Sequence, residues 1–492
     1  MSASPAAQIL RATGIIGGAS AVNVLIGLLR NKVAALVLGP LGIGLVGIFH
    51  NLVQTAAVLA ALGIGNVGTR QLAEAADDPH AQAVARRALV VAATALALGG
   101  GLLLFLLRRP VAELVLGNPQ WSDEVGWLAL GVTLLVGTVA QNGLLTGMRR
   151  IGDLARVSIA SALLGTSMGV GALLLWGERA LLAFVLLSPL ATFLVGAWYV
   201  RRLPQPAVTR PRFGELAPQW RTLARLGFAF TLGSVVSTGG QLAVRSLVQR
   251  ELGAESLGHF QASWTISLNY IGFILTAMAA DYYPRLTAAM REPREAADTV
   301  NHQAEIALLL GGPVLVGTVA LAPWIVQLLY SGEFLPAAEL LRWQIAGDLL
   351  KIASWPMGFV LLAGGHGRAF VLVELMGAVV MVGVTALALA PAGLLAPGIG
   401  YFAAYLAYAL VTWLLARRII GLRVAPAVRS TFAAVTLALA ATALLTWAAP
   451  LGGAIAGVLL AAALGWAGAL KLQHALPEPL ARLVGLLPGA AR

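Results

Sequence analysis

Three cationic side chains occur inside the first and seventh long apolar stretches of this sequence. Arg30 and Lys32 lie in the first stretch, and Arg245 lies in the seventh. If these stretches span a membrane, a charge at bilayer depth costs several kcal/mol unless it faces a water-filled cavity or a partner. The three residues are therefore candidates for a cavity that attracts anions, or else their long side chains reach up to the membrane interface. Arg30 and Lys32 are about 200° apart around a helix, so they cannot both face the same way.

Three further ionisable residues lie in later apolar stretches. Asp348 and Lys351 are three residues apart and can form an ion pair within one helix, which would neutralise both charges. The alternative is that they couple or bind charge as part of a transport site. Glu374 stands alone. If it is buried it could take up and release a proton, whereas reaching to the interface is the simpler alternative.

The sequence lacks the residues for thiol chemistry, metal binding and nucleotide binding. The sequence has no cysteine and only six scattered histidines, so neither a thiol nucleophile nor a metal site is expected. It has no G-x-x-x-x-G-K-[ST] phosphate loop, so an ion, potential or substrate gradient must supply any energy. Residues 42–47 match G-x-G-x-x-G, but no strand precedes them, and we interpret them as a helix-packing pattern. No cofactor is expected.

The apolar stretches themselves identify an integral membrane protein. Charged residues make up only 11% of the 492 positions, whereas soluble domains have about a quarter. This leaves no room for a sizeable soluble domain beside the membrane part. Fourteen transmembrane helices are predicted at about 12–38, 41–63, 85–107, 125–147, 155–177, 180–200, 225–249, 257–281, 303–330, 340–363, 368–391, 396–417, 427–449 and 451–472.

The net charge is +12, and the distribution of the basic residues along the chain indicates membrane topology rather than nucleic-acid binding. With the N-terminus in the cytoplasm, 24 of the 33 lysines and arginines fall in cytoplasmic segments, and only five fall in the opposite loops. This asymmetry fits the positive-inside rule, so we expect both termini to be cytoplasmic. The first apolar run is too long for a cleaved signal peptide and reads as a retained helix.

A constant offset of 214 residues relates the two halves of the chain. It superimposes Ser20 on Ser234, Gly39 on Gly253 and Gly44 on Gly258. The proline- and arginine-rich connection at 201–225 separates the two repeats. We therefore predict an N-lobe of six helices at 1–200, a basic cytoplasmic linker at 201–225, a C-lobe of six helices at 226–420, and two additional helices with a cytoplasmic tail at 421–492.

The even number of helices in each repeat predicts how the repeats are related. Six crossings return the chain to its starting side, so the two lobes should share one orientation, related by an axis along the membrane normal. Two such lobes are typical of an alternating-access transporter. The predicted fold class is an all-α integral membrane protein with about 14 transmembrane helices, two pseudo-symmetric six-helix lobes around a central cavity, and two C-terminal helices.

Short motifs at several of these places resemble one family of membrane proteins. They are the stretch from Arg342 to Lys351, Leu38-Gly39-Pro40 followed by Gly42 and Gly44, and Leu116-Gly117-Asn118. Over about residues 10–420 the chain resembles the Wzx-type O-antigen and lipid III flippases. These form the polysaccharide transporter family of the multidrug/oligosaccharidyl-lipid/polysaccharide (MOP) exporter superfamily. The two additional helices resemble instead the fourteen-helix lipid II flippases of that superfamily.

The resemblance implies transport rather than catalysis, in the bacterial inner membrane. The implied substrate is an undecaprenyl-diphosphate-linked oligosaccharide, such as an O-antigen unit, lipid III or a related polysaccharide repeat, moved from the cytoplasmic to the periplasmic leaflet. The implied partners are membrane lipid and the polysaccharide polymerase and chain-length proteins of the same pathway. A lipid II flippase remains an alternative. A cation-drug antiporter of the superfamily would need acidic side chains in its cavity to bind the cation. The clearest intramembrane charges of this chain are basic instead.

The resemblance also implies roles for the intramembrane cations. Lys32 falls where relatives carry a basic residue eight positions before the proline of the Gly-Pro pair, and Arg245 falls on a basic residue of their seventh span. Together with Arg30 these residues would hold the diphosphate, for which arginine offers a two-pronged set of donors. Residues 267–270 lack the acid that some relatives carry in the eighth span, which argues against proton coupling by that helix.

Polar side chains within the predicted helices could line the cavity and contact sugar hydroxyls or sugar faces. Nothing in the sequence orients them individually. The candidates are Asn23, His50, Gln54, Gln141, Asn142, Gln241, Gln261, Trp264 and Asn269.

Overall fold

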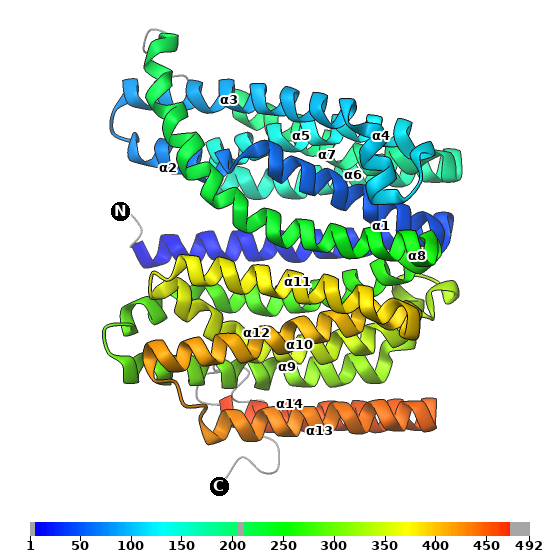
Figure 1. The fold of residues 1–492 in the computed structure, drawn as a ribbon. Coiled ribbons are helices and arrows are strands. Elements are labelled where there is room, and N and C mark those ends of the chain that lie inside the picture. The colour runs from blue at the N-terminus through cyan, green and yellow to red at the C-terminus, as the bar shows by residue number, and fades with distance from the viewer. Residues whose placement is uncertain (1–4, 205–210, 473–492) are drawn as a thin grey trace. The chain divides into compact units, whose positions relative to one another are not determined.

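The computed structural model describes residues 5–204 and 211–472, and these residues form fourteen α-helices and no β-strand. Helices satisfy their own backbone hydrogen bonds, which is required where no water is available inside a bilayer. The helices of the first half, labelled in Figure 1, are α1 (Pro5–Ala61), α2 (Ile64–Glu74), α3 (Pro79–Leu106), α4 (Arg108–Val111), α5 (Ser122–Gly147), α6 (Ile151–Trp176), α7 (Leu181–Arg201) and α8 (Phe213–Ala289).

The second half of the chain continues in the same way. Its helices are α9 (Pro293–Leu329), α10 (Ala337–Ala363), α11 (Gly367–Ala392), α12 (Ala396–Ile420), α13 (Pro426–Ala448) and α14 (Pro450–Leu472). Short connecting turns are a π-helical turn at Ala112–Leu116 and 3-10 turns at Pro119–Trp121, Gly177–Ala180, Gly332–Phe334 and Gly393–Leu395.

The predicted spans coincide with the observed helices. Within the described residues, nine stretches are long and apolar enough to cross a membrane, and they overlap twelve of the fourteen predicted spans. The other two, 225–249 and 257–281, both lie on α8. The predicted all-α membrane fold is therefore confirmed. The tail from residue 473 and residues 205–210 of the predicted linker lie outside the described residues.

Two glycines interrupt the longest helices at related positions. In α1 the backbone at Gly39 has φ 60°, and in α8 the backbone at Gly253 has φ 84°. A positive φ costs little at glycine because it lacks a Cβ, so the chain can change direction there without a loop. Each long helix thus contains two predicted spans joined at a single residue. The offset of 214 carries one break onto the other.

The second half of α1 crosses α8 in close contact just after these breaks. A Cβ added to Gly44 would lie 2.1 Å from the carbonyl oxygen of Ala254, and one added to Gly258 would lie 1.8 Å from that of Pro40. The offset of 214 exchanges these two contacts, because it carries Gly44 onto Gly258 and Pro40 onto Ala254. Small residues allow such close approach of helix backbones. Gly44 and Gly47 of the G-x-G-x-x-G string both face α8, so that string is the helix-packing pattern predicted for it.

Contacts divide the chain into two compact units. The first comprises Met1–Gln261 and Leu329–Glu333, and the second comprises Ala262–Leu328 and Phe334–Arg492. In the first unit, α5 packs against α1, α2, α3 and α7. In the second, α12 packs against α10 and α11, and α13 packs against α14 and α10. These units follow packing rather than the sequence repeat, and the lobe boundaries at 1–200, 201–225, 226–420 and 421–492 stay a prediction.

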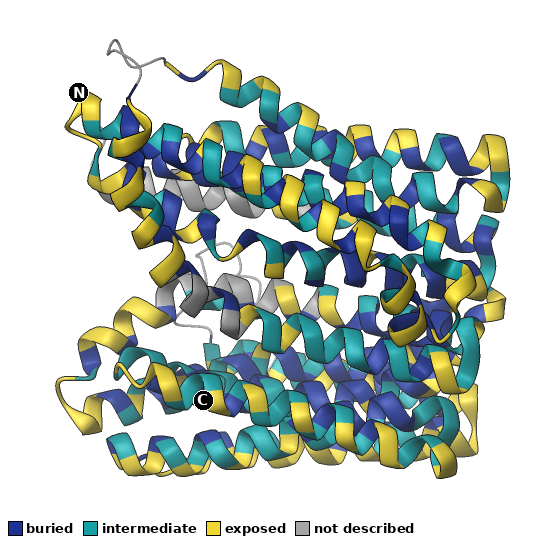
Figure 2. Ribbon diagram, turned by 45° about the horizontal axis from the view of Figure 1, so that its top comes forward, coloured by how far each residue is buried: buried dark blue, intermediate teal, exposed yellow. Residues whose placement is uncertain are grey.

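Large apolar side chains remain exposed on most helices, and Figure 2 shows exposed and buried residues alternating along them. On α13 and α14 the exposed residues include Leu444, Trp447 and Leu451, which are between 67% and 82% exposed. Between these two helices, Gly453 and Gly457 make close contact with α13. This arrangement fits two helices that pack on each other through small residues and present leucine and tryptophan to lipid.

Candidate functional site

Arg30 on α1 is held against α7 of the same unit. Its Nη2 donates a hydrogen bond to the carbonyl oxygen of Phe184 (2.9 Å), and its Cζ lies 4.2 Å from the centre of the Phe184 ring. The Nε atom is buried and has no hydrogen-bond partner in the part of the chain that the structure describes. A buried N–H of a charged group without a partner is uncommon. It leaves a donor available to a ligand.

Arg245 on α8 is almost completely buried, with 3% of its surface exposed. Its Nε donates to Oε1 of Gln261 (3.1 Å), and its Nη1 donates to the carbonyl oxygen of Gln241 (3.2 Å). Gln261 lies directly against Gly47, where an added Cβ would come within 2.6 Å of its Oε1. The glycine of the packing pattern therefore leaves room for the amide that orients Arg245.

His50 lies within electrostatic range of both arginines. It lies close enough to both Arg30 and Arg245 for their charges to act on its imidazole, and it is exposed. Lys32 takes a different direction and donates from Nζ to the carbonyl oxygen of Tyr330. Of the three predicted cations, Arg30 and Arg245 lie within electrostatic range of His50, whereas Lys32 is directed to Tyr330. We call Arg30, His50 and Arg245 the cationic cluster.

A cavity of about 330 Å³ lies within the first unit, one helical turn from His50. Gln54, which lines it, follows His50 by four residues, or about 6 Å along the helix axis. The lining contains amides, hydroxyls and aliphatic groups, and no charged side chain contributes to it among the described residues. Its lining residues are Gln54, Ala57, Val58, Ala61, Gly63, Gly65, Asn66, Leu135, Thr138, Val139, Asn142, Thr231 and Ser234.

Three amides in this cavity have unused hydrogen-bonding capacity. The side chains of Gln54, Asn66 and Asn142 line it, and none of them hydrogen-bonds to another residue of the described ranges. Each amide offers two N–H donors and one carbonyl acceptor. We call the cavity that these three residues line the amide cavity. Sequence reasoning singled out Gln54 and Asn142 but missed Asn66, because it follows the end of the predicted second span.

Two other predicted lining residues join helices of the first unit. Asn23 Nδ2 donates to Ser158 Oγ (2.6 Å), which links α1 to α6. Gln141 Nε2 donates to the carbonyl oxygen of Phe193 (3.1 Å), which links α5 to α7. These bonds occupy part of each amide, and a ligand-binding role for either residue stays a prediction.

In the second unit, Asp348 is completely buried on α10. Its carboxylate accepts hydrogen bonds from Ser267 Oγ of α8 (2.7 Å) and from the Tyr401 hydroxyl of α12 (2.6 Å). The Trp264 ring packs edge-on against Tyr401, with 5.4 Å between ring centres. Asn269, further along α8, is half-buried. Ser267 belongs to the 267–270 string, which lacks an acid. The carboxylate beside this string comes from Asp348 of α10.

Lys351 and Glu374 lie near a row of tyrosines on α12 in the same unit. Lys351 Nζ lies 5.2 Å from the centre of the Tyr405 ring, and Glu374 lies within electrostatic reach of Lys351 and Tyr408. Sequence reasoning missed this row, although the spacing of Tyr401, Tyr405 and Tyr408 places all three on one helix face. Whether Asp348 and Lys351 act as a structural pair or in coupling stays a prediction, as does the role of Glu374.

Comparison with known sequences gives a family and two named relatives. Residues 33–339 match the family described as "Polysaccharide biosynthesis protein". The chain is 27% identical over 402 residues to a protein named "Lipid III flippase" from Escherichia coli (strain K12), covering 79% of this chain and 93% of the relative. A protein of the same name from Shigella flexneri matches to the same extent.

Solved structures with a similar fold are membrane transporters. One is an inward-facing multidrug resistance MATE family transporter of the MOP superfamily, with a TM-score of 0.67, 19% identity, and coverage of 81% of this chain and 94% of that one. Another is the lipid II flippase MurJ in an inward closed conformation, with a TM-score of 0.70, 12% identity, and coverage of 92% and 98%. The chain therefore has the fold of these transporters.

Proposed function

The chain belongs to the polysaccharide biosynthesis protein family, and from this premise we propose that it is a flippase for lipid-linked oligosaccharides. Its substrate would be an oligosaccharide linked through a diphosphate to a polyprenyl lipid, carried from the cytoplasmic to the periplasmic leaflet by alternating access. The observation that carries this proposal is that Arg30 and Arg245 both lie within electrostatic range of His50, one helical turn from an uncharged cavity lined by amides.

The cationic cluster suits a diphosphate. Two like charges repel each other, and the repulsion is stronger away from bulk water. A bound dianion would offset that repulsion and would accept a hydrogen bond from the unpartnered Nε of Arg30. Arginine binds phosphate through paired, charge-assisted hydrogen bonds. Lys32 would then hold the outer end of α1 in place through Tyr330 rather than contact substrate.

The amide cavity suits the sugar that is joined to the diphosphate. Sugars carry hydroxyl and acetamido groups, which need both donors and acceptors, and Gln54, Asn66 and Asn142 offer both. Its volume is near the lower end of the range for small-molecule pockets, so it would accept one sugar ring rather than a whole oligosaccharide. Its distance of one helical turn from His50 matches a sugar bonded directly to the phosphate that the cationic cluster holds.

Two alternatives differ in substrate. A lipid II flippase would use the same diphosphate chemistry, and the fold shared with MurJ and the presence of α13 and α14 favour it as the second candidate. A drug antiporter is disfavoured because an organic cation would meet the arginines of the cationic cluster. We place the protein in the bacterial inner membrane with both termini cytoplasmic, and we propose a polysaccharide polymerase and a chain-length protein as partners.

The test is transport and binding by variants of Arg245. Arg245→Ala should weaken binding of a polyprenyl-diphosphate-linked saccharide by roughly 10- to 150-fold, since a hydrogen bond to a charged group contributes about 1.5–3 kcal/mol. Arg245→Lys should restore part of the loss, because the charge returns without the paired donors. Arg221→Ala, on an exposed part of the same helix, is the matched control.

The readouts are ligand titration and substrate-dependent transport in proteoliposomes. Equal binding by Arg245→Ala and the parent would reject the role of the cationic cluster. Binding of an organic cation in preference to the lipid diphosphate would favour the antiporter. Titration with lipid II beside a lipid-linked oligosaccharide distinguishes the two flippase readings.

A further inference from the structure

A second cavity, of about 650 Å³, lies between α3 and α5 of the first unit, and on α5 its lining ends at Thr133, just before Leu135 of the amide cavity. Glycine makes it possible: a Cβ on Gly101 would come within 2.2 Å of Thr133 Oγ1, and one on Gly126 would come within 3.1 Å of Arg108 Cδ. The two helices therefore approach closely beneath the cavity, and the missing side chains hollow out the surface above. We call this cavity the α3–α5 groove.

The walls of the groove are apolar and open to the membrane. Leu102, Phe105, Trp127 and Leu130 line it and are between 45% and 64% exposed. All four lie on helices that are apolar enough to span the bilayer, so the medium they meet is hydrocarbon. A hollow with such walls will be filled by an acyl chain rather than by water.

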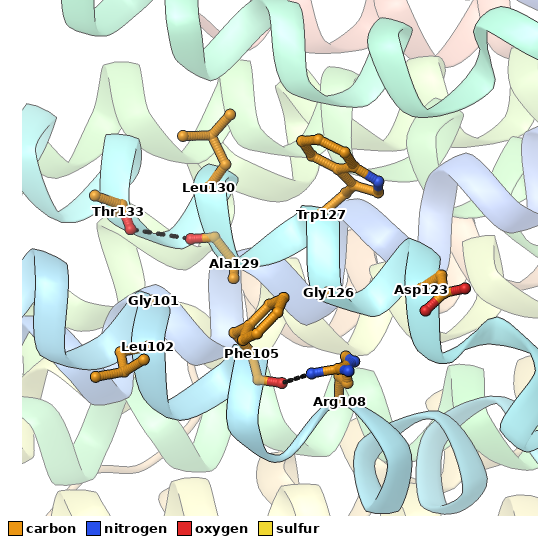
Figure 3. A pocket seen from close by; sticks show the side chains of 10 residues that line it. All are labelled: Gly101, Leu102, Phe105, Arg108, Asp123, Gly126, Trp127, Ala129, Leu130 and Thr133. Atoms are coloured by element: carbon orange, nitrogen blue, oxygen red, sulfur yellow. Dashed lines mark hydrogen bonds between the residues drawn. The ribbon is translucent and has the colours of Figure 1, made fainter.

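Both charged residues of the groove are located at one end. Figure 3 shows Arg108 and Asp123 on the same side of the view, with Leu102 and Thr133 at the other. Arg108 is fixed in place, because its Nη1 donates to the carbonyl oxygen of Phe105 (3.1 Å) and its Cζ lies 4.4 Å from the Phe105 ring centre. The guanidinium keeps further N–H donors.

Arg108 and Asp123 do not pair with each other. Among the residues that the structure describes, Arg108 and Asp123 form no ion pair, and Asp123 forms no hydrogen bond. The groove thus ends in one cation and one anion, both able to contact a ligand. A ligand with a phosphate and an ammonium group would match both charges.

The length of the groove matches one leaflet. From Arg108, at the start of α4, to Gly101 of α3 is about 10 Å at the helical rise, and from Asp123 to Thr133 along α5 is about 15 Å. Half of a typical hydrocarbon core is about 15 Å. With the predicted topology, Arg108 lies at the periplasmic interface, so the groove runs from that interface towards the bilayer midplane.

We propose that the α3–α5 groove is a binding site for a zwitterionic phospholipid with a primary ammonium group, phosphatidylethanolamine. One acyl chain lies along the apolar walls, the phosphate contacts Arg108, and the ammonium donates to Asp123. An anionic phospholipid would satisfy only Arg108. A lipid diphosphate would place two or more negative charges beside Asp123, so the groove is distinct from the cationic cluster.

Native mass spectrometry of the purified full-length protein tests this assignment. The protein is equilibrated with mixed micelles containing equal phosphatidylethanolamine and phosphatidylglycerol, and the bound lipids are counted. The parent should retain phosphatidylethanolamine preferentially. Asp123→Asn should lower that preference by about two- to fivefold, as expected for one exposed ion pair, and Arg108→Gln should weaken retention of both lipids.

Two variants serve as controls. Asp123→Glu should keep the preference because the carboxylate remains, and Arg109→Gln should leave it unchanged because Arg109 does not line the groove. Equal retention of both lipids by the parent, or an unchanged preference in Asp123→Asn and Arg108→Gln, would overturn the proposal. So would displacement of the bound phospholipid by a polyprenyl diphosphate. None of these readouts depends on transport, so they leave the proposed flippase function untouched.

Discussion

Replacing Gly258 by alanine should force apart the crossing of α1 and α8. The added Cβ would lie 1.8 Å from the carbonyl oxygen of Pro40, whereas ordinary contacts begin at 3.4 Å. The clash is with backbone, which cannot rotate away as a side chain can. The two helices must therefore separate by roughly 1.6 Å at this point, or the chain after the Gly253 break must deform.

The cost of this change can be estimated from overpacking. Inserting a methyl group into a tightly packed contact typically costs about 1–3 kcal/mol. If the crossing forms in one conformation of the transport cycle and opens in another, the same free energy shifts the equilibrium towards the open form by about 5- to 150-fold. Gly44→Ala should act in the same direction, because its Cβ would lie 2.1 Å from the carbonyl oxygen of Ala254.

The chain contains no cysteine, so paired spin labels can be introduced without removing any native thiol. Labels at Leu41 and Glu255, both exposed, report the distance between the two helices near the crossing. Gly258→Ala should lengthen and broaden the distance distribution and slow transport.

Gly27→Ala and Gly272→Ala are matched controls, because nothing lies within 4 Å of a Cβ at either position. Both should resemble the parent. An unchanged distance distribution together with normal transport in Gly258→Ala would refute the reasoning that backbone contact at this crossing excludes a side chain.

Three further predictions concern other parts of the chain. A reporter within 201–225 and another at the C-terminal end should both be cytoplasmic, and a periplasmic signal from either would contradict the fourteen-span topology. If Asp348 and Lys351 form a structural pair, either single neutralisation should lower the protein level and Asp348→Asn with Lys351→Met should restore level and transport; normal accumulation without transport would instead indicate a coupling role. The backbone N–H of Arg212 lowers the pKa of Glu215, so the stabilisation that its carboxylate gives is present above the ordinary pKa of glutamate and is lost as the pH falls through the lowered value. Limited proteolysis of the 201–225 connection between pH 7 and acidic pH should show faster cleavage at low pH, and Glu215→Gln should remove the dependence.

The sequence by itself determined that the fold is helical and where its long apolar helices lie. Hydrocarbon requires stretches of about 20 apolar residues, and that requirement can be read from composition along the chain without knowing any tertiary contact. The breaks at Gly39 and Gly253 could be anticipated in the same way, because a repeat offset and a glycine are both visible in one dimension.

Only the tertiary structure decided which polar residues share a site. A helix fixes the angle between Arg30 and Lys32, but its rotation depends on the neighbours that pack against it. Phe184 on α7 and Tyr330 after α9 hold the two side chains in different directions. The sequence could not predict which of Arg30 and Lys32 is directed towards the site of Arg245. The direction of each side chain depends on contacts with residues 154 and 298 positions away.

The partners of Asp348 and the place of Asn66 also depend on tertiary packing. Asp348 and Lys351 are three positions apart, which made an ion pair within the helix the simplest prediction. The structure adds hydrogen bonds to the same carboxylate from Ser267 and Tyr401, on two other helices, which the spacing along one helix could not reveal. Asn66 joins the amide cavity only because α2 follows α1 directly and packs against α5. Local patterns specify elements, whereas a binding site is built from side chains that only the packing of those elements brings together.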